Sequence, residues 1–164
     1  MKQEILQLTL DLCRIPSISG DEQNCASFLC HKLEELGFMV EKIPVDEKRF
    51  NIFAYFNKKP KFSAIFCSHI DTVAPFFAPQ FNDGMLLGRG VLDAKGIIAA
   101  MVFSVVNQRK AGFDDLALLF TVGEEESSDG AKACLLKDRA KLLVVGEPTD
   151  LKAASHQKGS LVFD

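Results

Sequence analysis

The sequence predicts an α/β domain in which helices are layered on a mixed, mainly parallel β-sheet, and three observations carry this prediction. Apolar residues recur at helical spacing in the N-terminal segment. Short runs rich in Ile, Phe, Val and Leu follow, each of the length of a strand. From residue 62 onward, strand-like and helix-like segments alternate, which is typical of parallel strands joined by crossover helices. The chain has 164 residues, 48% of them hydrophobic, which suffices for one domain with a core.

The N-terminal segment predicts two amphipathic helices. The first spans residues 3–14 and ends before Pro16. The second begins after Ser19–Glu22, because the S-x-x-E spacing is a capping box, and it ends at Gly37. Strands are expected at residues 39–45, 51–56 and 62–67. The N-terminal strands are expected to pair antiparallel, which makes the sheet mixed.

The second half of the chain predicts a β-α-β-α-β series. A helix over residues 94–110 is apolar almost throughout, so we expect it to pack flat on the sheet. The continuous apolar run 116–122 has the length of a buried strand. A helix near 131–136 and a strand at 142–145 complete the series. Residues 159–164 resemble the start of another strand, and we therefore interpret the chain as the N-terminal piece of a longer domain.

Composition excludes several classes of function. The net charge is -3, the basic residues are scattered, and one Tyr and no Trp offer few stacking platforms, so no nucleic-acid partner is expected. The N-terminus carries Glu4 and Asp11 and lacks a signal peptide, and no uninterrupted apolar run predicts a membrane span. The five cysteines form no C-x-x-C pair, which favours reduced thiols and a cytoplasmic protein.

Side chains that can bind a divalent metal gather beside the expected strand ends. They are His69 and Asp71 in SHIDTV, Asp93 in GRGVLDAKG, Glu124 and Glu125 in TVGEEESSDG, and Glu147 in VVGEPTD. The carboxyl edge of an open sheet is where such folds bring their functional residues together. One imidazole and several carboxylates at this edge predict a site for divalent metal.

The spacing within two of these segments strengthens the prediction. His69 and Asp71 lie at i and i+2, so both side chains point the same way from an extended segment, and a carboxylate beside an imidazole ligand fixes its orientation. Three adjacent carboxylates at 124–126 repel one another unless a cation lies among them. Each segment alone has an ordinary explanation, such as a helix cap or a solvated acidic loop. Their shared placement favours a metal centre.

Other interpretations of the same residues are weaker. Gly88 and Gly90 lack the third glycine of a dinucleotide fingerprint, because Asp93 stands in its place. No G-x-S-x-G elbow supports a serine hydrolase. Cys67 could be a further ligand, although a small buried apolar residue is the more common role for such a cysteine. His31 and His156 follow no sheet edge, so neither is expected to bind the metal.

Taken in order, the four segments resemble the signature segments of the co-catalytic zinc aminoacylase and metallopeptidase family. GEPTDLK followed by KGS is most similar to the acetylornithine deacetylase and succinyl-diaminopimelate desuccinylase branch. The resemblance implies the first half of a zinc-exopeptidase-like catalytic domain. It also implies that residues 1–164 lack a lid domain and the C-terminal half of the catalytic domain, and that these residues alone are inactive.

The resemblance also assigns roles to individual residues. The metal ligands would be His69, Asp93, Glu125 and Glu147. Asp93 would bridge two zinc ions, His69 and Glu147 would bind the first ion, and Glu125 would bind the second. The family further implies a cis peptide bond between Asp93 and Ala94.

Two residues would be catalytic rather than ligands. Asp71 would orient the imidazole, and Glu124 would be the general base. Because Glu126 follows Glu124 and Glu125, an assignment of the base and the ligand that is shifted by one residue along this acidic run stays open.

The implied activity is hydrolysis of the amide bond of N-acyl amino acids, like acetylornithine deacetylase, through a hydroxide shared by two zinc ions. A di- or tripeptidase or carboxypeptidase of the same family, or a metal-binding fragment without activity, is the alternative. Cobalt or manganese could replace zinc. The expected partner is a small N-acyl amino acid or peptide, and the complete protein would be a homodimer.

Overall fold

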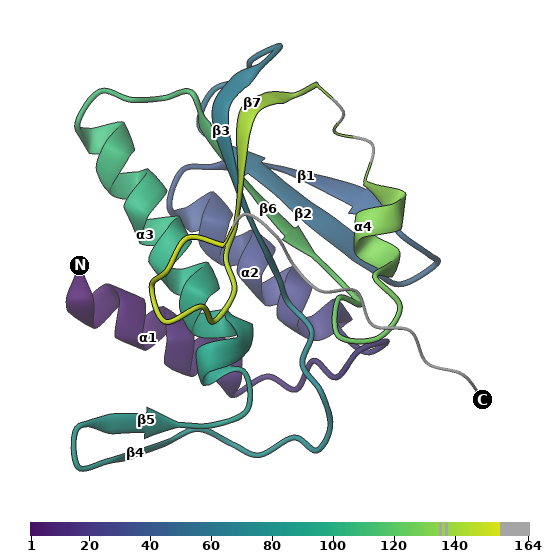
Figure 1. Cartoon of the computed structure of the whole chain (residues 1–164), viewed down its shortest axis with the longest axis vertical. Coiled ribbons are helices and arrows are strands. Elements are labelled where there is room, and N and C mark those ends of the chain that lie inside the picture. Colours follow the sequence, from purple (N-terminus) through teal and green to yellow (C-terminus); the bar gives the residue numbers. More distant parts are fainter. Residues whose placement is uncertain (135, 137, 155–164) are drawn as a thin grey trace.

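The computed structural model describes residues 1–134, 136 and 138–154, and its centre is a five-stranded sheet of order β1-β2-β6-β3-β7 (Figure 1). The strands are β1 (Met39–Pro44), β2 (Phe50–Tyr55), β3 (Phe62–His69), β6 (Leu116–Thr121) and β7 (Ala140–Val145). β2 pairs antiparallel with β1 and β6, whereas β3 pairs parallel with β6 and β7. The predicted mixed α/β sheet is therefore confirmed. The expected strand at 159–164 lies outside the described residues.

Three helices cover one face of the sheet: α1 (Lys2–Cys13), α2 (Gln23–Glu35) and α3 (Gly96–Lys110). Their apolar side chains, among them Leu12, Leu29 and Val102, form the larger core cluster with the sheet residues Ile52 and Leu118. Because side chains alternate along a strand, Phe53 and Leu119 point to the opposite face and form a second, smaller cluster. The short helix α4 (Asp129–Ala133) lies on the side of this second cluster (Figure 1).

The long apolar helix differs in one way from its prediction. It begins at Gly96, because a π-helical turn, η1 (Val91–Lys95), precedes it, and Asp93 and Ala94 within that turn have non-helical backbone angles. The peptide bond between Asp93 and Ala94 is cis, as the family resemblance implied. By length and composition alone, Val91–Lys110 could cross a membrane. Its side chains instead pack against α1 and the sheet, which explains why it is so apolar.

The capping-box prediction for α2 was wrong. Within the described residues, no side chain caps the first turn of this helix. Ser19 donates its hydroxyl proton to Asp71 Oδ2 at 2.7 Å, and Glu22 is buried and accepts the Gly20 N–H at 3.0 Å. The sequence around Ser19 is compatible with a helix cap and with a contact to a distant residue. The hydrogen bond to Asp71 is the one that forms.

A hairpin that the sequence analysis did not predict projects from one end of the molecule (Figure 1). Its strands are β4 (Gln80–Asn82) and β5 (Met85–Leu87). Asp83 and Gly84 both have positive φ angles, 49° and 79°. An Asp-Gly pair between short strands is the usual signal for such a turn, so the hairpin could have been found from the sequence.

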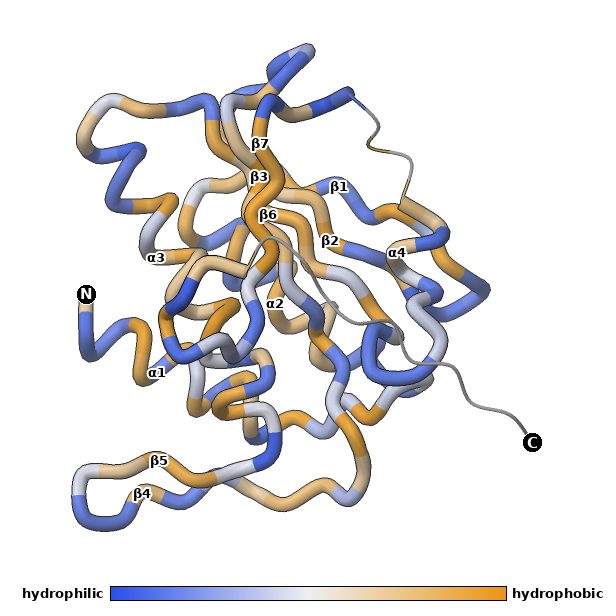
Figure 2. Tube along the Cα trace, viewed as in Figure 1, coloured by the Kyte–Doolittle hydropathy of each residue, from blue (hydrophilic) through white to orange (hydrophobic). Residues whose placement is uncertain are grey.

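The strand β7, which is last in the strand order, is apolar along most of its length (Figure 2). Leu142, Leu143 and Val145 are each more than half exposed, although β7 pairs with β3. On the face of the sheet opposite α1, α2 and α3, apolar side chains such as Leu143 and Val145 are therefore exposed beside His69 and Glu147.

Candidate metal centre

The six predicted site residues meet at one edge of the sheet. His69 is the last residue of β3, Glu124 and Glu125 follow β6, and Glu147 follows β7. Asp93 arrives from η1, which runs past the end of β3. The structure thus brings together segments that lie up to 78 residues apart, as the hydrogen bond from Ser68 Oγ to the Gly146 carbonyl illustrates.

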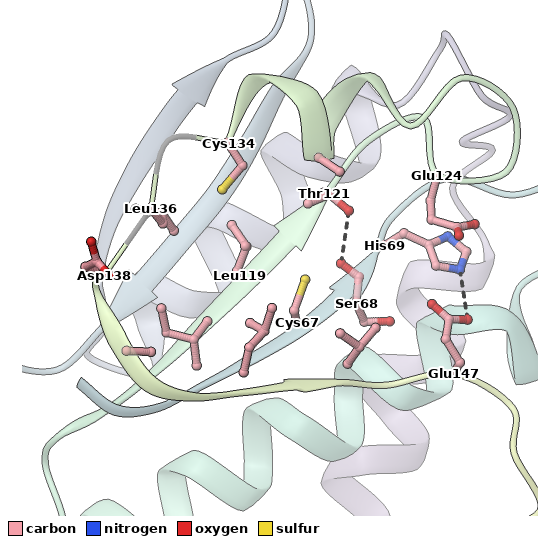
Figure 3. A pocket seen from close by; sticks show the side chains of 15 residues that line it. Cys67, Ser68, His69, Leu119, Thr121, Glu124, Cys134, Leu136, Asp138 and Glu147 are labelled. Carbon is pink, nitrogen blue, oxygen red and sulfur yellow. Dashed lines mark hydrogen bonds and ion pairs between the residues drawn. The ribbon is translucent and has the colours of Figure 1, made fainter. Parts of the chain in front are cut away.

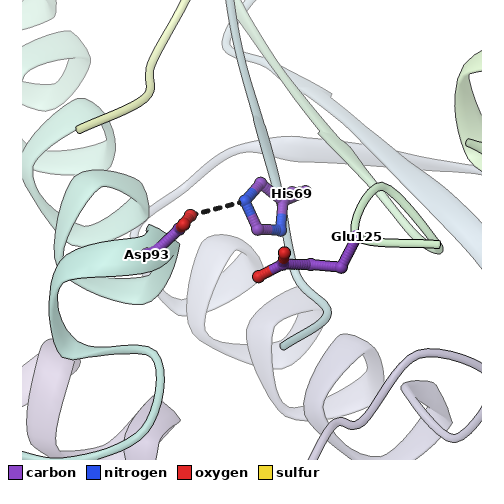
Figure 4. Close-up of side chains that lie close together, drawn as sticks. All are labelled: His69, Asp93 and Glu125. Carbon is purple, nitrogen blue, oxygen red and sulfur yellow. Dashed lines mark hydrogen bonds and ion pairs between the residues drawn. The ribbon is translucent and has the colours of Figure 1, made fainter. Parts of the chain in front are cut away.

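His69 is the centre of this group. Its side chain is 1% exposed, and each ring nitrogen faces a carboxylate group. Nε2 lies 2.9 Å from Asp93 Oδ1 and 3.7 Å from Glu147 Oε2. Nδ1 lies 3.0 Å from the Asp71 carbonyl oxygen and 3.4 Å from Asp71 Oδ1. Figure 4 shows that Glu125 approaches the same ring, and potential ligand atoms of His69, Asp93 and Glu125 all lie within 4.8 Å of one another.

Asp71 connects the imidazole with the acidic loop. This buried carboxylate accepts the backbone N–H groups of Glu124 and Glu125, each at 3.0 Å, in addition to the Ser19 hydroxyl. Burial alone would raise the pKa of Asp71, but hydrogen bonds from His69, Ser19 and the two amides outweigh it and lower the pKa to about 2. Asp71 is therefore ionised at neutral pH and holds a proton on Nδ1 of His69.

The donor set fits a divalent cation. A neutral imidazole donates from only one nitrogen, so when Nδ1 donates to Asp71, the lone pair of Nε2 faces the oxygens of Asp93 and Glu147. That contact is repulsive unless a positive charge lies between these groups. Burial lowers the pKa of His69, yet the surrounding Asp71 and Glu147 carboxylates raise it to about 11, so the charge is here a proton. A divalent metal supplies the same charge, and imidazole with carboxylates is a preferred ligand set for zinc.

The two glutamates of the loop differ in what they face. Burial raises the pKa of Glu124, and the negative charge of Glu147 adds to the effect. Burial also raises the pKa of Glu125, with Asp93 as the next cause. Glu125 faces His69 and Asp93, whereas Glu124 lines the adjacent cavity (Figure 3). Glu124 and Glu126 are both exposed, but among the described residues Glu126 belongs neither to the group around His69 nor to the cavity lining. The geometry therefore favours the frame with Glu125 as ligand.

The cavity beside the centre has a volume of about 580 Å³. Glu124, His69 and Glu147 line one end of it, and apolar side chains such as Leu119 and Val145 continue along β6 and β7 (Figure 3). The cavity therefore offers a partly apolar space directly beside His69 and the two glutamates.

Other residues considered in the sequence lie elsewhere. Cys67 lines the cavity and packs against the smaller core cluster, and burial is the main reason that its pKa is raised to about 12. His31 is exposed on α2 and lies 3.1 Å from Glu35. His156 lies outside the described residues. Ser19, which the sequence did not predict as part of the site, donates to Asp71, and no local signal in the sequence identifies this partner.

Comparisons with known proteins agree with this geometry. Residues 65–158 match the model of peptidase family M20/M25/M40. The chain is 40% identical to a probable carboxypeptidase of Emericella nidulans, covering 96% of this chain and 43% of that protein. It is 35% identical to a peptidase M20 domain-containing protein of Schizosaccharomyces pombe, covering 98% of this chain and 42% of that protein.

Solved structures show the same fold. A tripeptidase from Staphylococcus aureus superposes with a TM-score of 0.70 at 26% identity, covering 84% of this chain and 40% of that chain. The aminopeptidase PepT from Bacillus cereus gives a TM-score of 0.75 at 23% identity, covering 90% and 43%. The chain thus spans about two fifths of the length of the curated relatives it matches.

Proposed function

Because the chain belongs to peptidase family M20/M25/M40, we propose that it carries the metal-binding part of a metallopeptidase that cleaves amide bonds in small peptides. The observation that carries this proposal is the buried His69, whose Nε2 faces carboxylates from two other segments. The names of the relatives, probable carboxypeptidases among them, support a peptidase. The narrower deacetylase activity on N-acetylornithine stays a prediction.

Two divalent ions would be held by one imidazole and three carboxylates. The residues are His69, Asp93, Glu125 and Glu147. When bound, such ions polarise an amide carbonyl and lower the pKa of water. Zinc suits the nitrogen and oxygen donors, and cobalt or manganese would also fit them. A dinuclear metal-binding peptidase from the M20 family, solved from Bacillus subtilis, shares the fold at a TM-score of 0.63 and supports two ions rather than one.

The residues of this chain would supply orientation and proton transfer. Asp71 keeps the proton on Nδ1 of His69, which leaves Nε2 free as a ligand atom. Glu124 lines the cavity, and its raised pKa makes it a stronger base than a solvated glutamate. Its carboxylate would take a proton from the attacking water and return it to the nitrogen of the leaving amine.

Metal titration and a substrate panel test the proposal together. Calorimetric titration of the purified protein with zinc should show binding, and Asp93→Asn should weaken it strongly. Hydrolysis should then be measured with dipeptides, tripeptides and N-acetylornithine, in a full-length protein that contains these residues. Faster cleavage of peptides would support the peptidase, and faster cleavage of N-acetylornithine would favour the deacetylase. Metal binding without any turnover would point to a metal-binding module, and failure to bind any divalent metal would refute the proposed centre.

A further inference from the structure

The loop that carries Glu124 and Glu125 is closed by one side chain of β2. Asn51 is fully buried. Its Oδ1 accepts the Val122 N–H at 3.1 Å, and its Nδ2 donates to the Gly130 carbonyl oxygen at 2.8 Å. Val122 immediately precedes the loop 123–128, and Gly130 is the second residue of α4, which follows the loop. The Asn51 amide therefore contacts both ends of the loop, one with its acceptor and one with its donor.

The orientation of this amide is fixed by its partners. The backbone N–H of Val122 requires an acceptor, and the carbonyl of Gly130 requires a donor, so rotating the amide by 180° would break both hydrogen bonds. The two ends are also joined directly, because the Gly130 N–H donates to the Val122 carbonyl oxygen at 3.0 Å. A buried side chain that satisfies two backbone groups in this way leaves little freedom for the loop to shift.

The closure is tight at Gly130. A Cβ atom added there would lie 2.5 Å from Asn51 Oδ1 and 2.5 Å from the Val122 carbonyl oxygen. No side chain fits without moving the loop end away from β2. Next to this contact, the Arg49 guanidinium donates to Asp129 at 3.0 Å and forms a second, more exposed connection to the same loop end.

The opposite side of the loop faces the metal centre. There, the backbone N–H groups of Glu124 and Glu125 donate to Asp71. The loop is therefore held between Asp71 on one side and Asn51 on the other. A displacement at either point would change where Glu125 stands relative to His69 and Asp93.

We infer that Asn51 is a positioning residue of this site: it closes the acidic loop so that Glu125 faces the metal ligands and Glu124 faces the cavity. This inference rests on the proposed function. Asn51 hydrogen-bonds to the backbone at both ends of the loop and is not among the described residues that line the cavity, so it acts through the loop backbone. Loss of a partner that orients ligands typically costs about 10–100-fold in metal affinity or activity.

Two variants break the closure from opposite sides. Asn51→Asp keeps an acceptor for Val122 but places a second oxygen against the Gly130 carbonyl, where the two acceptors repel each other. Gly130→Ala inserts a methyl group into the same contact. The control is Leu33→Ala, which removes buried methyl groups from α2 and leaves the loop untouched.

Urea unfolding, zinc affinity by competition with a chelator, and kcat and KM should be measured for all three variants, each made in a full-length protein that contains these residues and under conditions in which each is folded. We expect both loop variants to lose about 10–100-fold in zinc affinity or kcat, with KM changed less than about threefold. The control should lose stability and keep zinc affinity and kcat. If Asn51→Asp does not fold, Asn51→Ser, which fits the same space, replaces it.

The outcomes separate the two levels of inference. A wild-type protein that binds no metal would refute the proposed function itself. A wild-type protein that binds metal and hydrolyses peptides, with loop variants that match the control in zinc affinity and kcat, would refute the positioning role and leave the proposed function intact.

Discussion

Replacing Asp71 by asparagine should destabilise the metal-free protein by about 2 kcal/mol, and the structure shows why. Oδ2 accepts from Ser19 and the Glu125 N–H, and Oδ1 accepts from the Glu124 N–H and faces Nδ1 of His69. An asparagine has one oxygen, so its NH₂ group must face donors on one side. The less costly orientation puts the NH₂ towards Ser19, whose hydroxyl can turn and accept.

Even in that orientation, the Glu125 N–H loses its acceptor. A buried hydrogen bond to a charged group contributes about 1.5–3 kcal/mol, and a donor left without a partner costs about 1–3 kcal/mol. The lowered pKa of Asp71 expresses the same hydrogen bonds in another way. Its fall from 3.8 to about 2 corresponds to roughly 2 kcal/mol, at about 1.4 kcal/mol for each unit.

Urea unfolding at pH 7 measures this difference. The control is Asp83→Asn in the β4–β5 turn, where the side chain is exposed and asparagine tolerates the positive φ, so its effect should stay within about 0.5 kcal/mol. The sign of the pH dependence follows from the depressed pKa. The contribution of Asp71 to stability is present at pH values above its pKa in the unfolded chain and is lost as the pH falls through about 2. The unfolding free energies of wild type and Asp71→Asn should therefore converge between roughly pH 4 and pH 2. An Asp71→Asn protein as stable as wild type at pH 7 would refute the hydrogen-bond argument.

Three further predictions concern catalysis, alkaline stability and packing. Glu124→Gln, made in a complete enzyme that contains this segment, should keep metal and lose about 10²–10⁴-fold in turnover, measured by metal analysis and peptide hydrolysis, whereas a metal-depleted Glu124→Gln protein would show that Glu124 was wrongly assigned as the base. Burial raises the pKa of the Cys13 and Cys30 thiols to about 11 in the folded state. Their contribution to stability is therefore complete at pH values below the pKa of an unfolded cysteine, and it is lost as the pH rises towards about 11. The urea midpoint should therefore decrease as the pH is raised from roughly 9 to roughly 11, and it should decrease less in Cys30→Ala. An equal decrease in both proteins would contradict a contribution from the Cys30 thiol. Gly146→Ala should destabilise by about 1–3 kcal/mol in thermal unfolding, because its Cβ would lie 2.5 Å from Cγ2 of the β-branched Ile97, and an unchanged melting temperature would contradict that contact.

The fold and the gathering of acidic residues could be predicted because both depend on regular rules. Apolar runs of strand length, joined by helical segments, predict parallel strands whose carboxyl ends share an edge. Residues placed directly after those runs, such as His69 and Glu147, must then lie near one another, whatever the rest of the chain does. In the structure, His69 Nε2 lies 3.7 Å from Glu147 Oε2. Asp93 is a different case, because it arrives from η1 rather than from a strand, and its position was inferred from its motif.

The contacts that hold the site in place could not be read from local pattern. Ser19 stands in a sequence that suits a helix cap, and its hydroxyl nevertheless donates to a carboxylate 52 positions away. Asn51 lies in an apolar strand, where a buried amide is costly unless both of its groups are satisfied, and its partners at Val122 and Gly130 are 71 and 79 positions away. Such pairings depend on how two segments approach in space, which spacing along one segment does not encode.

The contacts of Asp71 and Asn51 meet at the loop that carries Glu124 and Glu125, and together they hold its backbone in place. Asp71 and Asn51 fix the loop by its backbone, so the carboxylates of Glu124 and Glu125 stay free for other partners. Acidic side chains that neither cap a helix nor pair with the loop's own backbone can approach His69 at close range, where burial, together with the charges of neighbouring carboxylates, raises the pKa values of both. A rigid backbone is what keeps these repelling groups together, and a divalent cation is what would make their proximity favourable.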